Sequence, residues 1–151
     1  MPLKPEEVLQ IAVLKLARDV ITVPHRLRAF DRSKDFSGRA HIFQKNKGIR
    51  TGTPDLELIV EGRSINIELK APGTKHLASH QPSQHQEEEM ALLRGAGAYA
   101  GAAWSCVDVI EHWREAGVPM IGAAWEIAHM RDQIIESGPT MSAVVKRRRV
   151  A

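Results

Sequence analysis

Two carboxylates and a lysine stand at the ends of two neighbouring apolar segments. Asp55 precedes the first segment, a turn at Glu61-Gly62 follows it, and the second segment ends in Glu68 and Lys70. In the second segment a period of two places Glu68 and Lys70 on one face of a strand. Pairing through the short turn would bring Asp55 beside them. Such a group can hold a hard divalent cation on oxygen ligands while the lysine positions a water, as hydrolysis of a phosphodiester requires.

The rest of the chain predicts the elements that must position this group. A polar loop is expected between Lys70 and Pro82. Apolar spacing and capping signals predict helices at Pro5 to Asp19, Ser37 to Lys45, Ser83 to Arg94, Val107 to Ala116 and Ala123 to Glu136, a short strand and loop within Val20 to Arg32, and a strand at Ala98 to Trp104.

Gln86 has two interpretations. Ser83-Gln84-His85-Gln86 has the S-x-x-Q form of a capping box, in which the glutamine closes the first turn of a helix. The helical spacing of Gln86, Met90 and Leu93 also turns the glutamine towards the apolar side of that helix. An inward amide needs a polar partner, and the carboxylates and lysine of the two strands are the nearest candidates.

Length and composition limit the class of protein. A chain of 151 residues can bury one core, so we expect one domain at 1–139 and a flexible basic tail at 140–151. The single Cys106 can form neither an intrachain disulfide nor a cysteine zinc site, and the spacing of His76, His80 and His85 matches no zinc pattern. No apolar run is long enough to span a bilayer and no signal region is visible. We therefore expect a cytoplasmic protein.

Basic residues are concentrated before Asp55 and at the carboxyl end. Lys and Arg total 21 against 18 Asp and Glu, so the net charge of +3 is small and its distribution matters more. These segments would suit a polyanion approaching the strands. A solvated basic face without a ligand is the alternative.

The ordered combination of segments resembles the VRR-NUC branch of the PD-(D/E)XK nuclease superfamily. The resemblance spans Pro5 to about Ala116, which leaves 116–139 as a helical C-terminal extension. It implies an α/β fold with a restriction-endonuclease-like core, in which helices flank a central mixed sheet. The matching pieces are Gly52-Thr53-Pro54-Asp55, Ile67-Glu68-Leu69-Lys70, Ser83-Gln84-His85-Gln86 and the turn Leu92-Leu93-Arg94-Gly95-Ala96-Gly97.

The resemblance also implies an activity and its ligands. It implies a DNA endonuclease dependent on Mg²⁺ or Mn²⁺, acting on branched, flap or junction DNA in a phage or in replication and repair, within a bacterial or phage-infected cell. Asp55, Glu68 and the backbone carbonyl of Leu69 would ligate the metal. An acid on the first helix would join them, with Glu6 preferred over Glu7.

The same resemblance gives roles to the other motif residues. Lys70 would orient the attacking water and stabilise charge, and Gln86 would hold Lys70 or a metal-bound water, with Gln81 and Gln84 as alternative registers. The residues expected to contact DNA are Arg39, Lys45, Lys47, Arg50, Lys75, Lys146, Arg147 and Arg148.

Two other functions and one assembly state follow from the same residues. The chain could be a nucleic-acid-binding accessory module of this fold without catalysis. It could instead be a structural protein in which Glu68 and Lys70 form only an ion pair at a sheet surface. Because one site cuts one strand at a time, cleavage of both arms of a junction would need a homodimer, for which the helix at Ala123 to Glu136 offers an apolar face.

Overall fold

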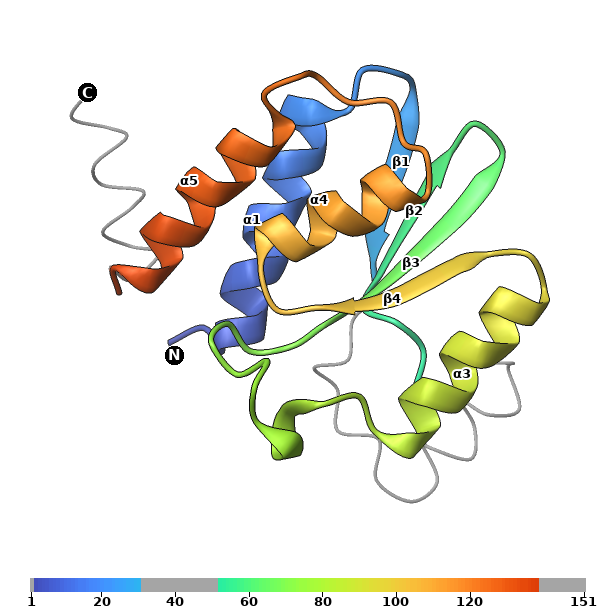
Figure 1. The fold of residues 1–151 in the computed structure, drawn as a ribbon, viewed down its shortest axis with the longest axis horizontal. Helices are drawn as coiled ribbons and strands as arrows, with labels where there is room; N and C mark the ends of the chain where they lie inside the picture. The colour runs from blue at the N-terminus through green and yellow to red at the C-terminus, as the bar shows by residue number, and fades with distance from the viewer. Residues whose placement is uncertain (1, 31–51, 139–151) are drawn as a thin grey trace.

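A computed structural model describes residues 2–30 and 52–138 of the chain. The described part contains a sheet of four strands in the order β1-β2-β3-β4, in which β1, β2 and β3 are antiparallel and β4 runs parallel to β3 (Figure 1). The elements in chain order are α1 (Pro5–Val20), β1 (His25–Ala29), β2 (Leu56–Val60), β3 (Arg63–Leu69), the 3-10 helix η1 (Ala78–His80), α3 (Gln84–Gly95), β4 (Tyr99–Ala103), α4 (Cys106–Glu115) and α5 (Ala124–Glu136).

The hairpin expected from the sequence is present. β2 and β3 pair with Leu56 opposite Ile67 and Val60 opposite Arg63, so only Glu61 and Gly62 form the turn. Both turn residues have positive φ, 49° and 73°, as a two-residue type I′ turn requires. The turn length fixes the register, and the register decides which residues meet at the far end of the hairpin.

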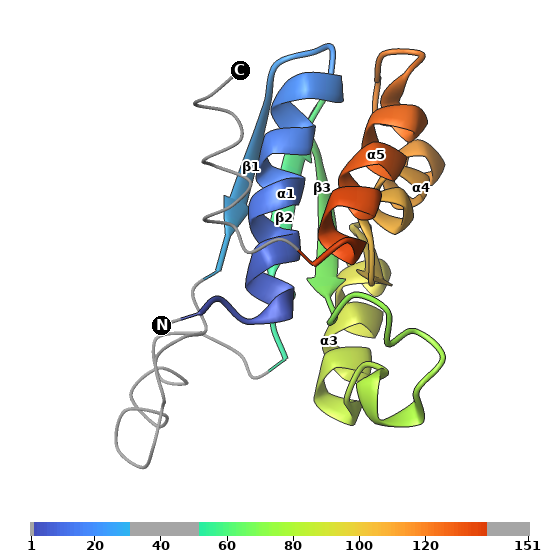
Figure 2. The same ribbon diagram turned by 90° about the vertical axis from the view of Figure 1, so that its left-hand side faces the viewer.

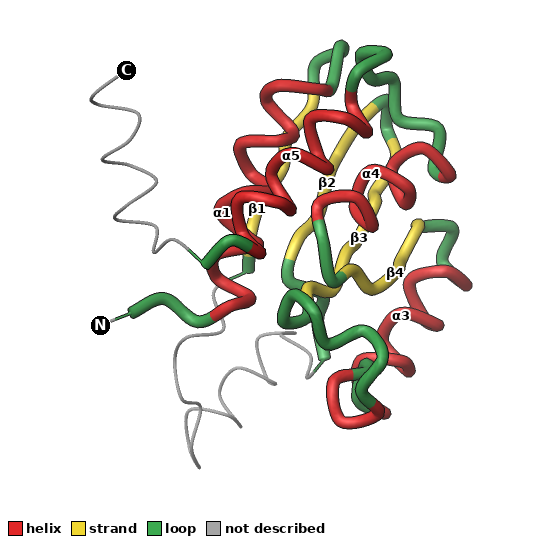
Figure 3. Tube along the Cα trace, turned by 60° about the vertical axis from the view of Figure 1, so that its left-hand side comes forward, coloured by secondary structure: helices red, strands yellow, loops and turns green. Residues whose placement is uncertain are grey.

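The core lies on one face of the sheet. Side chains such as Leu58 and Ile65, which are at most 1% exposed, pack with residues of α1 and α4, including Val13 and Ile110. α5 packs on α1 and α4, and its Ala128 is fully buried. Figures 1 and 2 show α1, α4 and α5 together on one side, while α3 lies apart near the end of β3. Figure 3 shows the same separation of α3 from the other helices.

Most predicted elements are confirmed, with shifts at their ends. The short strand predicted within Val20 to Arg32 is confirmed as β1, although Val20 itself is the fully buried last residue of α1. The loop predicted after Lys70 contains η1. The predicted helix from Ser37 to Lys45 and the tail at 140–151 lie outside the described residues. No helix in the described part of the chain has the length and apolar character needed to cross a membrane.

Candidate active site

Asp55 and Glu68 lie opposite each other on neighbouring strands. The pairing of Leu56 with Ile67 places Asp55, one residue before β2, across from Glu68 in β3. Both carboxylates project from the sheet face that α1 and α4 do not cover, since side chains alternate along a strand and Leu56 and Ile67 point into the core. The Glu68 residue is only 3% exposed. The predicted approach of the two carboxylates therefore follows from the observed register.

The Asp55 carboxylate also takes the place of a backbone hydrogen-bond partner for Leu69. Its Oδ2 accepts a hydrogen bond of 2.8 Å from the backbone N–H of Leu69. By register Pro54 would face Leu69, and proline has no N–H to donate to the Leu69 carbonyl. The carbonyl oxygen proposed as a metal ligand thus lies on the same side of β3 as Asp55, because the N–H and C=O of one strand residue point the same way.

Gln86 joins Lys70 to Glu68. Its Oε1 accepts a hydrogen bond of 2.6 Å from Lys70 Nζ, and its Nε2 donates to Glu68 Oε1. Lys70 Nζ itself lies 3.9 Å from Glu68 Oε1. The amide is oriented unambiguously, since its oxygen faces a donor and its nitrogen faces a carboxylate. Gln86, which the sequence pattern predicted to lie near the two strands, therefore fixes the position of the Lys70 ammonium beside Glu68.

Gln86 also closes the start of α3. Ser83 N donates to Gln86 Oε1 at 2.8 Å, and Gln86 N donates to Ser83 Oγ at 3.2 Å, which completes a capping box. Both interpretations of this residue are therefore correct. Gln86 Oε1 accepts hydrogen bonds from both Ser83 N and Lys70 Nζ. It therefore holds the start of α3 next to the end of β3.

Gly52 brings the segment before Asp55 against the first turn of α3. Its φ is +86°, and a Cβ built there would lie 2.6 Å from the carbonyl oxygen of His85 and 3.0 Å from the nitrogen of Gln86. A side chain at this position would therefore meet rigid backbone in a conformation that already disfavours L residues. The glycine allows the strand with Asp55 and the helix with Gln86 to approach closely.

The first-helix acids take different positions. Glu7 Oε2 accepts a hydrogen bond of 2.8 Å from the backbone N–H of Lys4 and so forms part of the capping of α1. Among residues 2–30 and 52–138, no three His, Cys, Asp or Glu side chains gather as a group that could hold a metal ion, so Glu6 does not join Asp55 and Glu68 in such a group. The role of Glu6 stays a prediction.

The predicted DNA contacts lie mostly outside the described residues. Lys75 is described, and its Nζ pairs with Asp108 at 3.1 Å and lies 5.5 Å from the centre of the Trp104 ring. The others, which stay predictions, are Arg39, Lys45, Lys47, Arg50, Lys146, Arg147 and Arg148.

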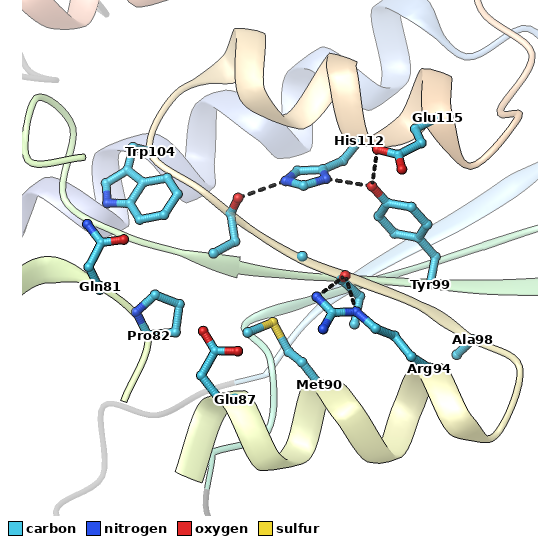
Figure 4. Close-up of a pocket in the computed structure, with 13 residues that line it drawn as sticks. Gln81, Pro82, Glu87, Met90, Arg94, Ala98, Tyr99, Trp104, His112 and Glu115 are labelled. Carbon is cyan, nitrogen blue, oxygen red and sulfur yellow. Dashed lines mark hydrogen bonds between the residues drawn. The ribbon is translucent and has the colours of Figure 1, made fainter. Parts of the chain in front are cut away.

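A groove of about 580 Å³ runs along the outer edge of β4, between α3 and α4 (Figure 4). Its walls carry Glu87 and Arg94 from α3 and His112 from α4, and Trp104 closes one end. Arg94 donates to the carbonyl of Ala100, so the groove wall covers part of the strand edge. The groove lies beside the carboxylate pair but does not include it.

The groove also contains the only tyrosine of the chain. The Tyr99 hydroxyl lies 2.7 Å from His112 Nδ1 and 3.0 Å from Glu115 Oε2. Burial is the main cause that raises the pKa of Tyr99 to about 12, and the hydrogen bond to Glu115 and its charge add to it. His112 Nε2 lies 2.7 Å from the carbonyl oxygen of Ala102 and donates to it. The cluster thus ties α4 to β4 and brings negative charge to this groove.

Sequence reasoning did not single out Phe30. Its N–H donates to the carbonyl of Asp55 at 2.9 Å, which places it opposite Asp55 on the other side from Glu68. The signal was the alternation of Arg26, Arg28 and Phe30 in β1 and just beyond it. Because residues 31–51 separate β1 from β2 in the chain, the sequence pattern did not show that Phe30 lies opposite Asp55.

The fold and site define an α/β protein with a restriction-endonuclease-like core, a mixed sheet with helices and a carboxylate pair at one end of its two central strands. A solved structure described as a VRR_NUC domain protein is similar to this chain, with a TM-score of 0.52 and 19% sequence identity over 78% of this chain and 93% of that chain. No protein-family model and no curated protein matches the chain. The likeness shows a shared fold and agrees with the resemblance drawn from the motifs.

Proposed function

We propose that this protein is a metal-dependent DNA endonuclease that hydrolyses phosphodiester bonds. The observation that carries the proposal is the arrangement of Asp55 opposite Glu68, with Lys70 held beside them by Gln86. These groups come from three separate elements and meet at one end of the sheet. The shared fold with a VRR_NUC domain protein supports the same activity.

The residues present fit a hard divalent cation such as Mg²⁺ or Mn²⁺. Mg²⁺ is commonly held by one or two protein carboxylates, with waters and substrate phosphate completing its shell. Asp55 and Glu68 supply two carboxylates, and the Leu69 carbonyl, on the same side of β3 as Asp55, supplies a third oxygen. Such an ion, when bound, would polarise the phosphate and lower the pKa of a water. All the proposed ligands are oxygens, as this metal class prefers.

Lys70 and Gln86 would act on the nucleophile and the developing charge. An ammonium has three donors, and Gln86 takes one of them at 2.6 Å. The others can reach the attacking water and a phosphate oxygen, where fixed positive charge favours the transition state. Gln86 would act as a positioning residue, since it holds the lysine and Glu68 in one geometry.

Structure selectivity and assembly form the finer part of the proposal. We infer branched, flap or junction DNA as substrate, in replication, repair or a phage cycle, on the basis of the motif resemblance. A homodimer would allow two strands to be cut. The exposed apolar side chains of α5, which include Met130 at 60% and Ile134 at 46%, support α5 as the contact surface.

A cleavage panel tests the function. Single-stranded, duplex, flap and four-way DNA would be incubated with the protein and Mg²⁺ or Mn²⁺, with a chelator as the negative control. We expect metal-dependent cutting that is strongest on branched substrates. DNA that is bound but left intact with either metal would favour the accessory binding module.

A further inference from the structure

One face of β1 and of the residue that follows it presents two arginines and an aromatic ring. Arg26, Arg28 and Phe30 alternate with Leu27 and Ala29, so they project from the same face of the sheet as Asp55 and Glu68. The Arg28 side chain is 52% exposed. Ile59, which lies opposite Arg26, is 39% exposed on the same face, so this part of the sheet is accessible.

Phe30 is the neighbour of the proposed catalytic centre. Its backbone N–H bonds to the Asp55 carbonyl, and directly opposed residues of antiparallel strands project to the same face about 5 Å apart. Phe30, just after β1, Asp55, just before β2, and Glu68 in β3 therefore form one row across this end of the sheet. A nucleotide attached to a phosphate at the carboxylates would have its base within reach of this ring.

Arg28 is fixed by neighbours on two sides. Its guanidinium carbon lies 4.9 Å from the centre of the Phe30 ring, and its Nε and Nη2 lie 3.0 and 2.9 Å from Glu57 Oε1. Glu57 in turn accepts from Ser64 Oγ at 2.8 Å, and Ser64 accepts from Asn66 Nδ2. This chain of contacts extends over three strands, so the guanidinium plane is oriented before any ligand arrives.

A guanidinium held over an aromatic ring matches the chemistry of an unpaired nucleotide. Bases that are not paired in a duplex stack on aromatic rings and on arginine planes, and arginine also binds phosphate. Bases inside a duplex are already stacked on each other and cannot use such a platform. The β4 groove at the other edge of the sheet is less suitable, since its two carboxylates, Glu87 and Glu115, outnumber its one arginine, Arg94.

We propose that Phe30 and Arg28 form a stacking platform for an unpaired nucleotide of the DNA substrate next to the scissile phosphate, with Arg26 contacting the phosphate backbone. This inference rests on the proposed nuclease function and deepens it, because it gives a physical origin for a preference for DNA with unpaired nucleotides. In a purely structural role, the Arg28 and Glu57 pair would only fix the register of β1 on β2.

Binding measurements separate these two roles. Fluorescence anisotropy of a dye-labelled single strand, and of a blunt duplex of the same sequence, would be recorded with a chelator present to prevent cutting. Phe30→Leu and Arg28→Ala should each weaken binding of the single strand about tenfold and change duplex binding by less than about twofold. Phe30→Tyr, which keeps the ring, should bind as the wild type does.

The control is Arg114→Ala on α4, which removes the same charge from an exposed residue on the opposite side of the sheet. It should affect both DNA forms slightly and equally. Wild-type affinity in Phe30→Leu, or equal losses on single strand and duplex, would overturn the platform. If the wild type cuts DNA while these variants bind normally, only this inference fails. A wild type that neither binds nor cuts DNA would remove the proposed function as well.

Discussion

Lys70 Nζ lies 2.6 Å from Gln86 Oε1, although Lys70 follows β3 and Gln86 lies in the first turn of α3. Because the same amide donates to Glu68, the three side chains form a single hydrogen-bonded unit. The capping box of α3 uses the same Oε1, so the start of a helix supports the geometry of the site. Helix stability and lysine positioning can nevertheless be separated by mutation.

Gln86→Glu makes this separation. A glutamate keeps the capping box, because S-x-x-E caps as well as S-x-x-Q, but it removes the donor to Glu68 and places a second carboxylate beside it. We expect α3 to remain capped and helical, as circular dichroism would show, and activity to fall about 10- to 100-fold. Gln84→Glu, in the same helical turn and with its side chain bonded to Glu88, is the control and should keep full activity. Equal activity in both variants would contradict the positioning role.

Gly52→Ala should destabilise the protein more than a glycine substitution at a similar backbone conformation. Gly52 has φ +86° and contacts His85, whereas Gly73 has φ +80° and a Cβ added there would meet nothing within 4 Å. Each alanine should cost about 1 kcal/mol for the positive φ, and Gly52→Ala should cost about 1–3 kcal/mol more because α3 must move. Urea unfolding of both variants measures the difference. Identical losses would mean that the contact with α3 is unimportant.

The hairpin was predictable because its signals are local. Alternation of apolar residues and a two-residue turn at Glu61-Gly62 determine which residues pair, and Asp55 then lies opposite Glu68 by counting. The capping box at Ser83 was predictable for the same reason. Helix ends were less predictable, since Val20 is helical owing to its burial in the core rather than to any capping signal.

Other features depend on contacts between distant segments. Gly52 reads in the sequence as part of a loop, and only its packing on His85 explains why it must be glycine. The pairing of Phe30 with Asp55 joins segments separated by residues 31–51, so no local pattern determines its register. Glu7 shows the opposite case, because its local capping bond to Lys4 distinguishes it from Glu6 once the helix start is known.

Tyr99 gives a spectroscopic test of the β4 groove. It is the only tyrosine, so tyrosinate absorbance reports this residue alone. The folded protein should titrate at about 12 and the urea-unfolded chain near pKa 10. Because the folded state binds the proton more tightly, this residue's contribution to stability is complete below pH 10 and is lost as pH rises towards 12. A native midpoint near 10 would contradict the hydrogen-bonded, partly buried environment of Tyr99, and Tyr99→Phe should reduce the loss of stability over this pH range.

Asp132→Ala should loosen α5 from α4. The Asp132 carboxylate accepts hydrogen bonds from the backbone N–H groups of Cys106 at 2.7 Å and Val107 at 3.0 Å, so a residue of α5 caps the start of α4. Loss of such a cap costs about 1–2 kcal/mol. Urea unfolding should show this loss, and Glu136→Ala, at the exposed end of α5, should change stability by less than about 0.5 kcal/mol. Equal stability of the two variants would exclude the capping role.

If Asp55, Glu68 and Lys70 form a metal-dependent phosphodiesterase site, removal of the Glu68 carboxylate should abolish cleavage, and a DNA cleavage assay of Glu68→Ala measures this. Branched DNA would be incubated with Mg²⁺ or Mn²⁺ and equal amounts of wild type, Glu68→Ala and the control Glu88→Ala, after circular dichroism has shown that all three are folded. We predict that the wild type and Glu88→Ala cut, that a chelator stops both, and that Glu68→Ala loses activity by at least about a hundredfold. Cutting by folded Glu68→Ala at the wild-type rate would show that Asp55, Glu68 and Lys70 do not form the active site.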